Sequence, residues 1–497
     1  GHLLATTRLI YKAVLETIGI DYITFRLLAV STVLLSAAFL YALAKRRIGA
    51  VPALAPTLVL LFFGSAWQHV VVPIGFVSLL SITGGLASLL ALERGDLRGD
   101  IAACALISLS IATFTTGFAF LVGVAISVLL RPDRQRRAWI FLIPLTLYAA
   151  WWLSQVSTSS AEQQAKPSNV LLIPSYVAES LASVTAGLAG LNFEFADSDS
   201  NPLLRDELGW GPVVATLAVV ALALRIRRGN LPHSLWVSLG IVLTYWSLGA
   251  LVASDFYSRA PSNVRYMYEG AVGVLLVATD ASRSIRFSRL GLVVLFGACA
   301  FSLATNVALM REGAAIFRDE YSRQARAQFA MLELARDHVQ PDFFAADAGR
   351  DVAPVRGVAA SYFATVDRFG SPAFSLPELE RQDDSVRQGA DQLLARALGV
   401  RLDRSIRQPG RGCREIPASE RGGAIGFELP RGGASLRAQG VAPGSMMLGR
   451  FATSPTVEVG SLFPGETAKL RIPPDSSPRP WRGSVTGVRA VTACALR

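Results

Sequence analysis

The chain has 497 residues, of which 52% are apolar and only 17% are charged. Soluble proteins carry a charged fraction nearer ~25%, so this composition excludes an ordinary soluble enzyme and favours a membrane protein. The net charge of +11 raises the question of nucleic-acid binding, but 15 of the 48 basic residues lie in five short gaps between apolar runs, which argues against it. The four cysteines form no CxxC pair, which excludes a zinc ribbon or a thioredoxin-type motif.

Ten apolar runs precede Met310, and their lengths predict the fold class. A membrane-spanning helix needs about 20 apolar residues. Seven runs meet or approach that length: 25–44, 73–92, 137–153, 210–225, 234–253, 267–280 and 289–309. Three runs are shorter: 51–64, 101–113 and 117–130. We therefore predict a membrane all-α fold, a polytopic helical bundle of about ten spans, some of them short or broken.

The gaps between these runs are alternately rich and poor in arginine and lysine. Cytoplasmic loops retain basic residues, so the rich gaps are predicted to be cytoplasmic. They are the groups Lys45–Arg47, Arg94 with Arg98, Arg131–Arg137, Arg225–Arg228 and Arg283–Arg289. The opposite side then receives residues 1–24, the Trp67 segment, the Thr115 turn, the loops 154–209 and 254–266, and the C-terminal tail. The pattern predicts a multi-pass plasma-membrane protein with an extracytoplasmic tail.

The alternation also bears on the two adjacent short runs, 101–113 and 117–130. They could form one overlong helix, but Thr115, Thr116 and Gly117 interrupt them. Merging them would place consecutive basic gaps on opposite sides of the membrane. We therefore predict two short helices joined by a turn, an arrangement tolerated where backbone is buried against protein or lines a wet cavity.

Two further segments have an amphipathic helical pattern. In the long loop, apolar residues recur at steps of three and four, at Val177, Leu181, Val184, Leu188 and Leu191. This helix either lies on the membrane surface or packs on other protein. Residues 7–20 have a similar pattern.

The tail has 26 basic and 21 acidic residues from Arg311 onward and divides in two. Residues 311–339 and 376–398 are predicted helices within an extracytoplasmic helical region, 311–412. Short alternating or β-branched runs separated by Gly and Pro predict a small antiparallel sandwich or jelly roll over 413–497; examples are 424–429, 456–459, 468–472 and 484–492. Cys413 and Cys494 bracket this module, so a disulfide is expected on the oxidising side. Cys104 and Cys299 lie in apolar runs and are expected to be inert packing residues.

No short motif for nucleotide, metal or hydrolase chemistry is present, so the candidate site rests on polar residues near the membrane. The strongest cluster contains Asp255, Tyr257, Arg259, Arg265, Tyr266, Tyr268 and Glu269. Arg259 and Arg265 lie in a short outward loop, although basic residues are usually retained in cytoplasmic loops. A bound phosphate would compensate their charge, because guanidinium groups match phosphate oxygens in bidentate geometry. The alternative is that Arg265 pairs with Asp255 or Glu269 and only ties the loop.

A second cluster on the same side contains Trp67, Gln68 and His69. Trp67 is either an interfacial anchor or, with its neighbours, part of a substrate-binding edge. His69 could donate to a leaving phosphate or relay a proton. His2 is a third candidate, with a surface histidine as the alternative.

These features together are similar to those of a known class. They are the Gly1–His2 start with the Arg8–Ile20 stretch, the Phe63–His69 turn, the paired short runs to Leu130, and Arg265–Tyr268. Over about residues 1–310, the chain resembles the GT-C class of membrane glycosyltransferases, and more narrowly the bacterial members with a soluble extracytoplasmic tail. The resemblance implies transfer of a sugar from a polyprenyl-phosphate donor on the extracytoplasmic face. It also implies a catalytic Asp or Glu in a first outward loop, which would precede Gly1.

The resemblance assigns roles to the candidate residues. Arg259 and Arg265 would hold the donor phosphate, while His69 and Asp255 are candidate catalytic groups. Substrate-binding positions would be Trp67, Gln68, Tyr266, Tyr268 and His2. No cofactor is indicated with certainty, and a divalent metal remains open.

The leading hypothesis is therefore a hexosyl- or pentosyltransferase of the cell envelope. Its partners would be membrane lipid, a polyprenyl-phosphate sugar and a glycan or glycolipid acceptor, with no nucleic acid. The alternatives are an envelope lipid or glycan transporter or flippase, and a non-catalytic membrane scaffold that displays the sandwich. The near absence of charge within the apolar runs, with Glu269 as the main exception, weighs against transport.

Overall fold

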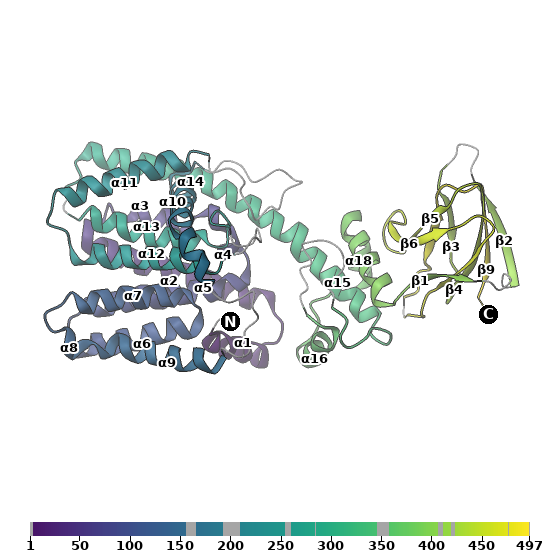
Figure 1. The fold of residues 1–497 in the computed structure, drawn as a ribbon, viewed down its shortest axis with the longest axis horizontal. Helices are drawn as coiled ribbons and strands as arrows, with labels where there is room; N and C mark the ends of the chain where they lie inside the picture. Colours follow the sequence, from purple (N-terminus) through teal and green to yellow (C-terminus); the bar gives the residue numbers. More distant parts are fainter. Residues whose placement is uncertain are drawn as a thin grey trace. The chain divides into compact units, whose positions relative to one another are not determined.

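The computed structural model describes residues 3–155, 166–191, 209–253, 260–283, 285–344, 357–405, 411–418, 423–475 and 477–496. The chain divides into two compact units, Gly1–Ala315 and Ile316–Arg497, which we call unit 1 and unit 2. Unit 1 is a helical bundle and unit 2 combines helices with a β-sandwich (Figure 1).

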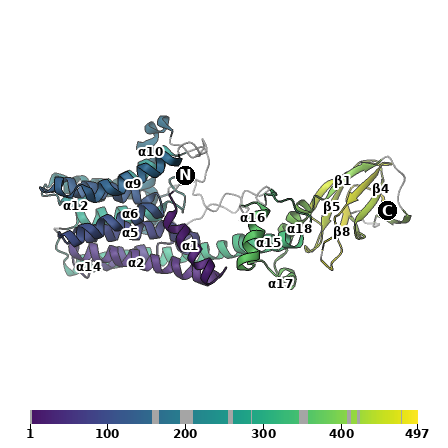
Figure 2. The ribbon, with the colours of Figure 1, turned by 90° about the horizontal axis from the view of Figure 1, so that it is seen from below.

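Unit 1 contains the following helices, most of which run lengthwise through it (Figures 1 and 2): α1 Ala5–Thr17, α2 Tyr22–Ile48, α3 Leu54–Leu61, α4 Trp67–Val71, α5 Phe76–Leu92, α6 Leu97–Thr113, α7 Thr116–Leu129, α8 Arg134–Arg137, α9 Trp139–Gln155, α10 Ile173–Ala189, α11 Gly211–Arg227, α12 His233–Leu251, α13 Met267–Ala281 and α14 Arg289–Ile316. Short 3₁₀ turns precede three of them: η1 Gly64–Ala66, η2 Pro73–Gly75 and η5 Pro167–Leu172. Each of the ten predicted apolar runs coincides with one of these helices or with a pair of them.

Five helical stretches of the described chain are long and apolar enough to cross a membrane: Tyr22–Ile48, Pro73–Leu92, Pro167–Ala189, His233–Leu251 and Arg289–Leu334. The bent pair Leu54–Leu61 and Gly64–Val71 makes a sixth if it is counted as one span. The predicted count of about ten spans is not confirmed, because α6, α7, α9, α11 and α13 have only 14 to 17 residues.

The two adjacent short runs form separate helices, as predicted. α6 ends at Thr113 and α7 begins at Thr116, and both helices contact α5. The turn between them is tight because Gly117 approaches the preceding helix; a Cβ there would lie 2.6 Å from the Ser110 carbonyl carbon. A side chain at this position would therefore separate the two helices.

The five basic gaps meet at one end of unit 1, which we call the basic end. The contacts that join them are Arg46 to Glu93 (2.6 Å), Arg47 to Asp280 (2.9 Å), Arg131 to the Leu92 carbonyl (3.0 Å) and Arg225 to the Ala281 carbonyl (3.0 Å). At the opposite end, the Thr7 hydroxyl donates to the Thr113 carbonyl (3.2 Å). The gaps rich in arginine and lysine thus lie at the basic end, and the Thr113 turn, a gap poor in these residues, lies at the opposite end.

The amphipathic segment of the long loop forms α10, which packs on α11, α12 and α13. Val184 is buried and Leu181 and Leu188 lie partly buried against the unit 1 core. Of the two alternatives left by the sequence, the structure shows the helix packed on protein.

Asn306 of α14 joins η1, α10 and α14. Its Oδ1 accepts from the Ser65 backbone N–H (3.1 Å), and its Nδ2 donates to the Gly187 carbonyl of α10 (2.9 Å). η1 and α14 approach closely at Gly64, where a Cβ would lie 1.8 Å from the Asn306 carbonyl oxygen. The turn that leads into α4 is therefore fixed by a glycine and a buried amide.

Unit 2 begins with the π-helical turn η7 Phe317–Ser322 and α15 Arg323–Leu334, within the predicted helix 311–339. The predicted helix 376–398 is two helices, α17 Leu376–Glu380 and α18 Asp384–Ala397. Its predicted apolar face is buried in the unit 2 core: Leu379, Val386, Leu393, Leu394 and Leu398. α16 Ala359–Phe369 was not predicted.

The sandwich has two antiparallel sheets, in the strand orders β1-β7-β4-β9-β2 and β3-β8-β5-β6. The strands are β1 Arg401–Ser405, β2 Arg411–Pro417, β3 Ile425–Glu428, β4 Gly433–Gln439, β5 Gly444–Gly449, β6 Val457–Leu462, β7 Thr467–Arg471, β8 Arg482–Val485 and β9 Ala490–Ala495. β1 pairs with β7, so the sheet begins before residue 413, and the predicted run 484–492 is divided between β8 and β9. Cys413 of β2 and Cys494 of β9 form a disulfide.

The helices of unit 2 and the sandwich share one core rather than forming separate modules at residue 412. Asp391 of α18 shows why. Its buried carboxylate accepts hydrogen bonds from the backbone N–H groups of Arg450, Phe451 and Ala452, at 2.8 to 3.1 Å. Burial raises the pKa of Asp391, because desolvation outweighs these N–H donors and the nearby Arg450.

The close approach at Gly64 is testable by substitution. Gly64→Ala should destabilise unit 1 by about 1–3 kcal/mol, since the added methyl would displace the α14 backbone. The matched control is Gly297→Ala, in α14, the helix that Gly64 approaches. A Cβ at Gly297 would meet no atom within 4 Å. Thermal unfolding of the full chain in detergent should show a lower Tm for Gly64→Ala alone; equal shifts would contradict the packing described.

The disulfide should stabilise unit 2 because it closes a long loop in the unfolded chain, with a sequence separation of 81 residues. Replacing both Cys413 and Cys494 with Ser should lower the free energy of unfolding of unit 2 by about 2–4 kcal/mol. Urea-dependent proteolysis of the full chain would measure this. Reductant should reproduce the effect in the wild type and leave the double variant unchanged; a wild type insensitive to reduction would refute it.

Candidate functional site

A buried contact between His69 and Glu269 joins α4 and α13 at the end of unit 1 opposite the basic end. His69 Nε2 lies 3.2 Å from Glu269 Oε1, and the two side chains are 6% and 4% exposed. The Tyr268 ring stacks on the His69 imidazole, with the ring centroids 6.1 Å apart. The pair brings together the two clusters that the sequence singled out, the Trp67 turn and the start of the run 267–280.

Local structure fixes both partners. The Arg26 guanidinium donates to the carbonyls of Val70 and Val71, so the end of the short helix α4 is held by α2. Gly75 packs under His69, since a Cβ there would lie 2.4 Å from the His69 carbonyl oxygen. Glu269 lies in the first turn of α13, where free N–H groups favour a negative charge. His69 is therefore positioned by α2 and Gly75, and Glu269 by the first turn of α13.

Several buried polar atoms around this pair have no hydrogen-bond partner in the described structure. They are Trp67 Nε1, Gln68 Oε1, His69 Nδ1, Tyr268 Oη and Glu269 Oε2. Buried polar groups are nearly always satisfied, so these five atoms are candidates for contacts with water or a ligand. His69 and Glu269 each use one polar atom on the other and keep one for a further partner.

Arg265 lies just before α13 and is exposed. Its backbone N–H donates to Asn263 Oδ1 (2.9 Å), which shapes the turn that precedes the helix. The alternative was that Arg265 pairs with Asp255 or Glu269; in the described structure Glu269 contacts His69, and pairing with Asp255 stays a prediction. His2, Asp255, Tyr257 and Arg259 lie outside the described residues, so their predicted roles stay predictions.

The aromatic residues are more buried than a sugar-binding surface requires. Trp67 is 1% exposed and Tyr268 is 0% exposed, and Gly313 of α14 packs against the Trp67 indole. In the structure both rings pack inside unit 1, and their predicted substrate-binding role stays a prediction. Tyr266 is partly buried, and its carbonyl lies 3.5 Å from the Tyr245 hydroxyl.

This arrangement suits proton exchange or anion binding. Because Glu269 contacts Nε2, the imidazole orientation is fixed, and the buried Nδ1 is the ring nitrogen that has no partner in the described structure. Among the described residues, no group of three His, Cys, Asp or Glu side chains could hold a metal ion. Exposed Arg265 could add a guanidinium fork for a phosphate.

Two further buried pairs lie at the basic end, and the sequence did not single them out. Arg47 of α2 pairs with Asp280 of α13, and Asp280 also accepts from Ser234 Oγ (2.5 Å) and Ser238 Oγ (2.6 Å). Arg137 pairs with Asp100 of α6. The available signal was an acidic residue at the end of an apolar run, the same signal that identified Glu269.

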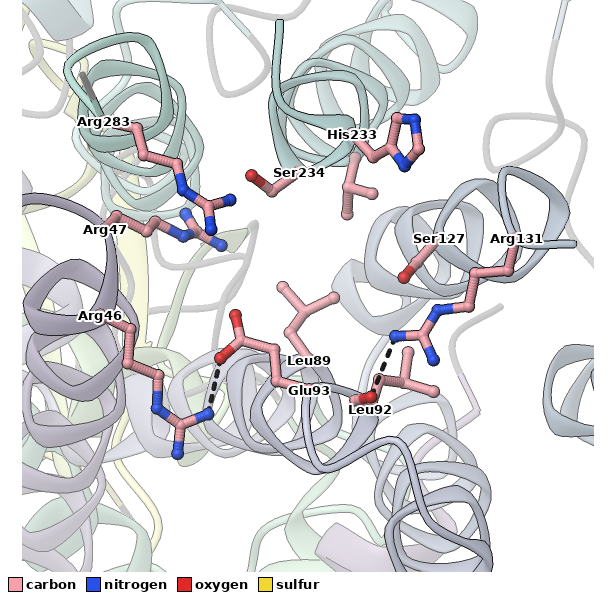
Figure 3. A pocket seen from close by; sticks show the side chains of 11 residues that line it. Arg46, Arg47, Leu89, Leu92, Glu93, Ser127, Arg131, His233, Ser234 and Arg283 are labelled. Atoms are coloured by element: carbon pink, nitrogen blue, oxygen red, sulfur yellow. Dashed lines mark hydrogen bonds and ion pairs between the residues drawn. The ribbon is translucent and has the colours of Figure 1, made fainter.

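A cavity of about 470 Å³ lies beside the Arg47–Asp280 pair (Figure 3). It is therefore at the opposite end from His69 and Glu269, where the sequence predicted the chemistry. Arginines from several basic gaps line it, together with Glu93 and the start of α12. We treat it separately below.

The two pairs near this cavity should differ in strength. Asp280→Asn should destabilise unit 1 by about 3–5 kcal/mol, because it leaves the Arg47 charge buried without a counterion. Glu93→Gln removes the carboxylate of the Arg46–Glu93 pair, whose side chains are 54% and 32% exposed. It should lower the free energy of unfolding by at most about 1 kcal/mol. Thermal unfolding of the full chain measures both, and equal losses would contradict the structural role of Asp280.

No protein-family model matches the chain, and no curated protein is similar to it in sequence. Among solved structures, it is similar to the crystal structure of ArnT from Cupriavidus metallidurans in the apo state. The TM-score is 0.37 and the sequence identity is 13%, over 72% of this chain and 76% of that one. Agreement at this level assigns no activity, so the functional interpretation depends on the residues themselves.

Proposed function

We propose that the chain is an integral membrane glycosyltransferase that transfers a sugar from a polyprenyl-phosphate donor to an envelope glycan or glycolipid on the extracytoplasmic face. The observation that carries this proposal is the buried His69–Glu269 pair beside the turn with exposed Arg265. A cation and an oriented imidazole at one end of an apolar bundle suit a ligand with a phosphate head and an apolar chain.

The position of the pair supports the choice of side. Glu269 lies in the first turn of α13, whereas Asp280, near the end of the same helix, pairs with Arg47 at the basic end. Basic loops mark the cytoplasmic side. The His69–Glu269 pair therefore belongs to the opposite side, where a lipid-linked sugar would be used.

The proposed roles follow from the atoms available. In the transfer, the bond from the sugar C1 to the donor phosphate oxygen breaks, and a bond to the acceptor hydroxyl forms as that hydroxyl loses its proton. The departing phosphate gains negative charge. Arg265, together with Arg259, would hold this phosphate, and His69 would donate from Nδ1 while Glu269 stabilises the imidazolium through Nε2. No residue of this cluster is assigned as the base that takes the acceptor proton.

The first test concerns Arg265. The full chain in nanodiscs would be supplied with a panel of polyprenyl-phosphate hexoses and pentoses, and release of polyprenyl phosphate would be followed. Arg265→Ala should lower kcat/KM about 10²-fold, since it removes a preorganised cation from the leaving group. Arg227→Ala changes an exposed arginine near the end of α11 and should retain wild-type rates. Normal turnover by Arg265→Ala would refute this phosphate site.

The second test asks whether His69 and Glu269 act as one unit. His69→Gln and Glu269→Gln should each lower kcat about tenfold or more, and the double variant should lose little beyond the more damaging single change. Unfolding temperatures of all three variants separate catalytic loss from misfolding. Independent, multiplicative losses would show that the two side chains do not share a role.

A further inference from the structure

We propose that the cavity at the basic end binds a phosphate-bearing anion, with a lipid headgroup or a soluble phosphate as the two sources. This site is distinct from the proposed transferase site and does not depend on sugar transfer. The cavity has a volume of about 470 Å³, large enough for a substituted phosphate. Figure 3 shows side chains from α2, α5, α7, α12 and the segment after α13 around it.

The lining has a marked excess of positive charge. Four arginines line the cavity against one carboxylate, Glu93. Glu93 pairs with Arg46, and Asp280 pairs with Arg47. Arg131 donates to the Leu92 carbonyl (3.0 Å), and in the described structure the exposed Arg283 guanidinium has no acceptor. Two cations are therefore left without a paired carboxylate at one cavity.

A buried donor adds to this excess. Arg47 has a side chain that is only 6% exposed, and its Nε has no hydrogen-bond partner in the described structure although Nη1 is paired. Buried donors without acceptors are costly. Arg47 lines the cavity beside Arg283 (Figure 3), so its buried guanidinium adds to the positive charge of the cavity wall.

The start of α12 contributes in the same direction. His233 and Ser234, the first two residues of this 19-residue helix, line the cavity. The helix has no side-chain N-cap, because Pro232 precedes it. Free backbone N–H groups and the helix dipole favour an anion at such an end. They act here together with the arginines that line the same cavity.

The rest of the lining favours a phosphate with an organic substituent. Leu89, Leu92 and Val237 form an apolar part of the wall, which would suit the glycerol carbons of a phospholipid. Basic cavities between helices on the cytoplasmic side are suited to anionic headgroups. Guanidinium forks match phosphate oxygens better than a single point charge does.

The experiment measures binding to the full chain in detergent. The two probes are a short-chain phosphatidylglycerol and inorganic pyrophosphate, with short-chain phosphatidylcholine as the zwitterionic comparison. Either anionic probe should raise Tm and bind in calorimetric titration, whereas phosphatidylcholine should bind much more weakly. Binding of the lipid alone identifies a headgroup site, and binding of pyrophosphate alone identifies a site for soluble phosphates; both support the proposal.

Variants locate the binding. Arg131→Ala and Arg283→Ala should each weaken binding about tenfold, and together about 100-fold, because each removes a charge-assisted hydrogen bond. Glu93→Gln should strengthen binding, since it removes the carboxylate from the lining. Arg227→Ala and Arg286→Ala change exposed arginines outside the cavity lining and should bind as the wild type does.

The ligand-free Tm of each variant shows whether it is folded. The proposal is overturned if neither anionic probe binds the wild type. It is equally overturned if the folded Arg131→Ala/Arg283→Ala variant binds as tightly as the Arg227→Ala control. None of these readouts requires sugar transfer, so failure here and failure of the transferase proposal are separate results.

Discussion

Ionised side chains inside an apolar bundle must be paired, and this requirement organises unit 1 around α13. Glu269 and Asp280 lie eleven residues apart on this helix, about three turns, so they fall on nearly the same face. Glu269 meets His69 of α4, and Asp280 meets Arg47 of α2. One helix is thus held at both ends by buried carboxylates, and each carboxylate fixes the position of a basic group that belongs to a candidate site.

The two carboxylates differ in how completely they are satisfied. Both Asp280 oxygens accept hydrogen bonds, from Arg47 and from the serines of α12. Glu269 uses one oxygen on His69, and its other oxygen has no partner in the described structure. A satisfied network rigidifies a fold, whereas an incomplete one has capacity for a ligand or water. This contrast separates a structural pair from one suited to chemistry, although both carboxylates are buried.

The helices were predictable because apolar runs and basic gaps are properties of consecutive residues. All ten runs became helices, and the interruption at Thr115 was placed correctly. Side-chain partners could not be predicted in the same way, since the pairing of His69 with Glu269 joins residues 200 positions apart. The burial of Trp67 depends on Gly313 of α14, which no local pattern indicates. The strand β1 was missed because its pairing with β7, rather than its own alternation, makes it part of the sheet.

The Cys413–Cys494 disulfide has a consequence for biogenesis. It joins the edge strand β2 to β9 and encloses nearly the whole sandwich. It can close only after residue 494 has been synthesised and has reached the compartment that contains residue 413. Stable disulfides form in oxidising compartments and are rare in the cytosol. The redox state of this one bond in cells therefore records on which side of the membrane the sandwich was delivered, and it forms only when delivery is complete.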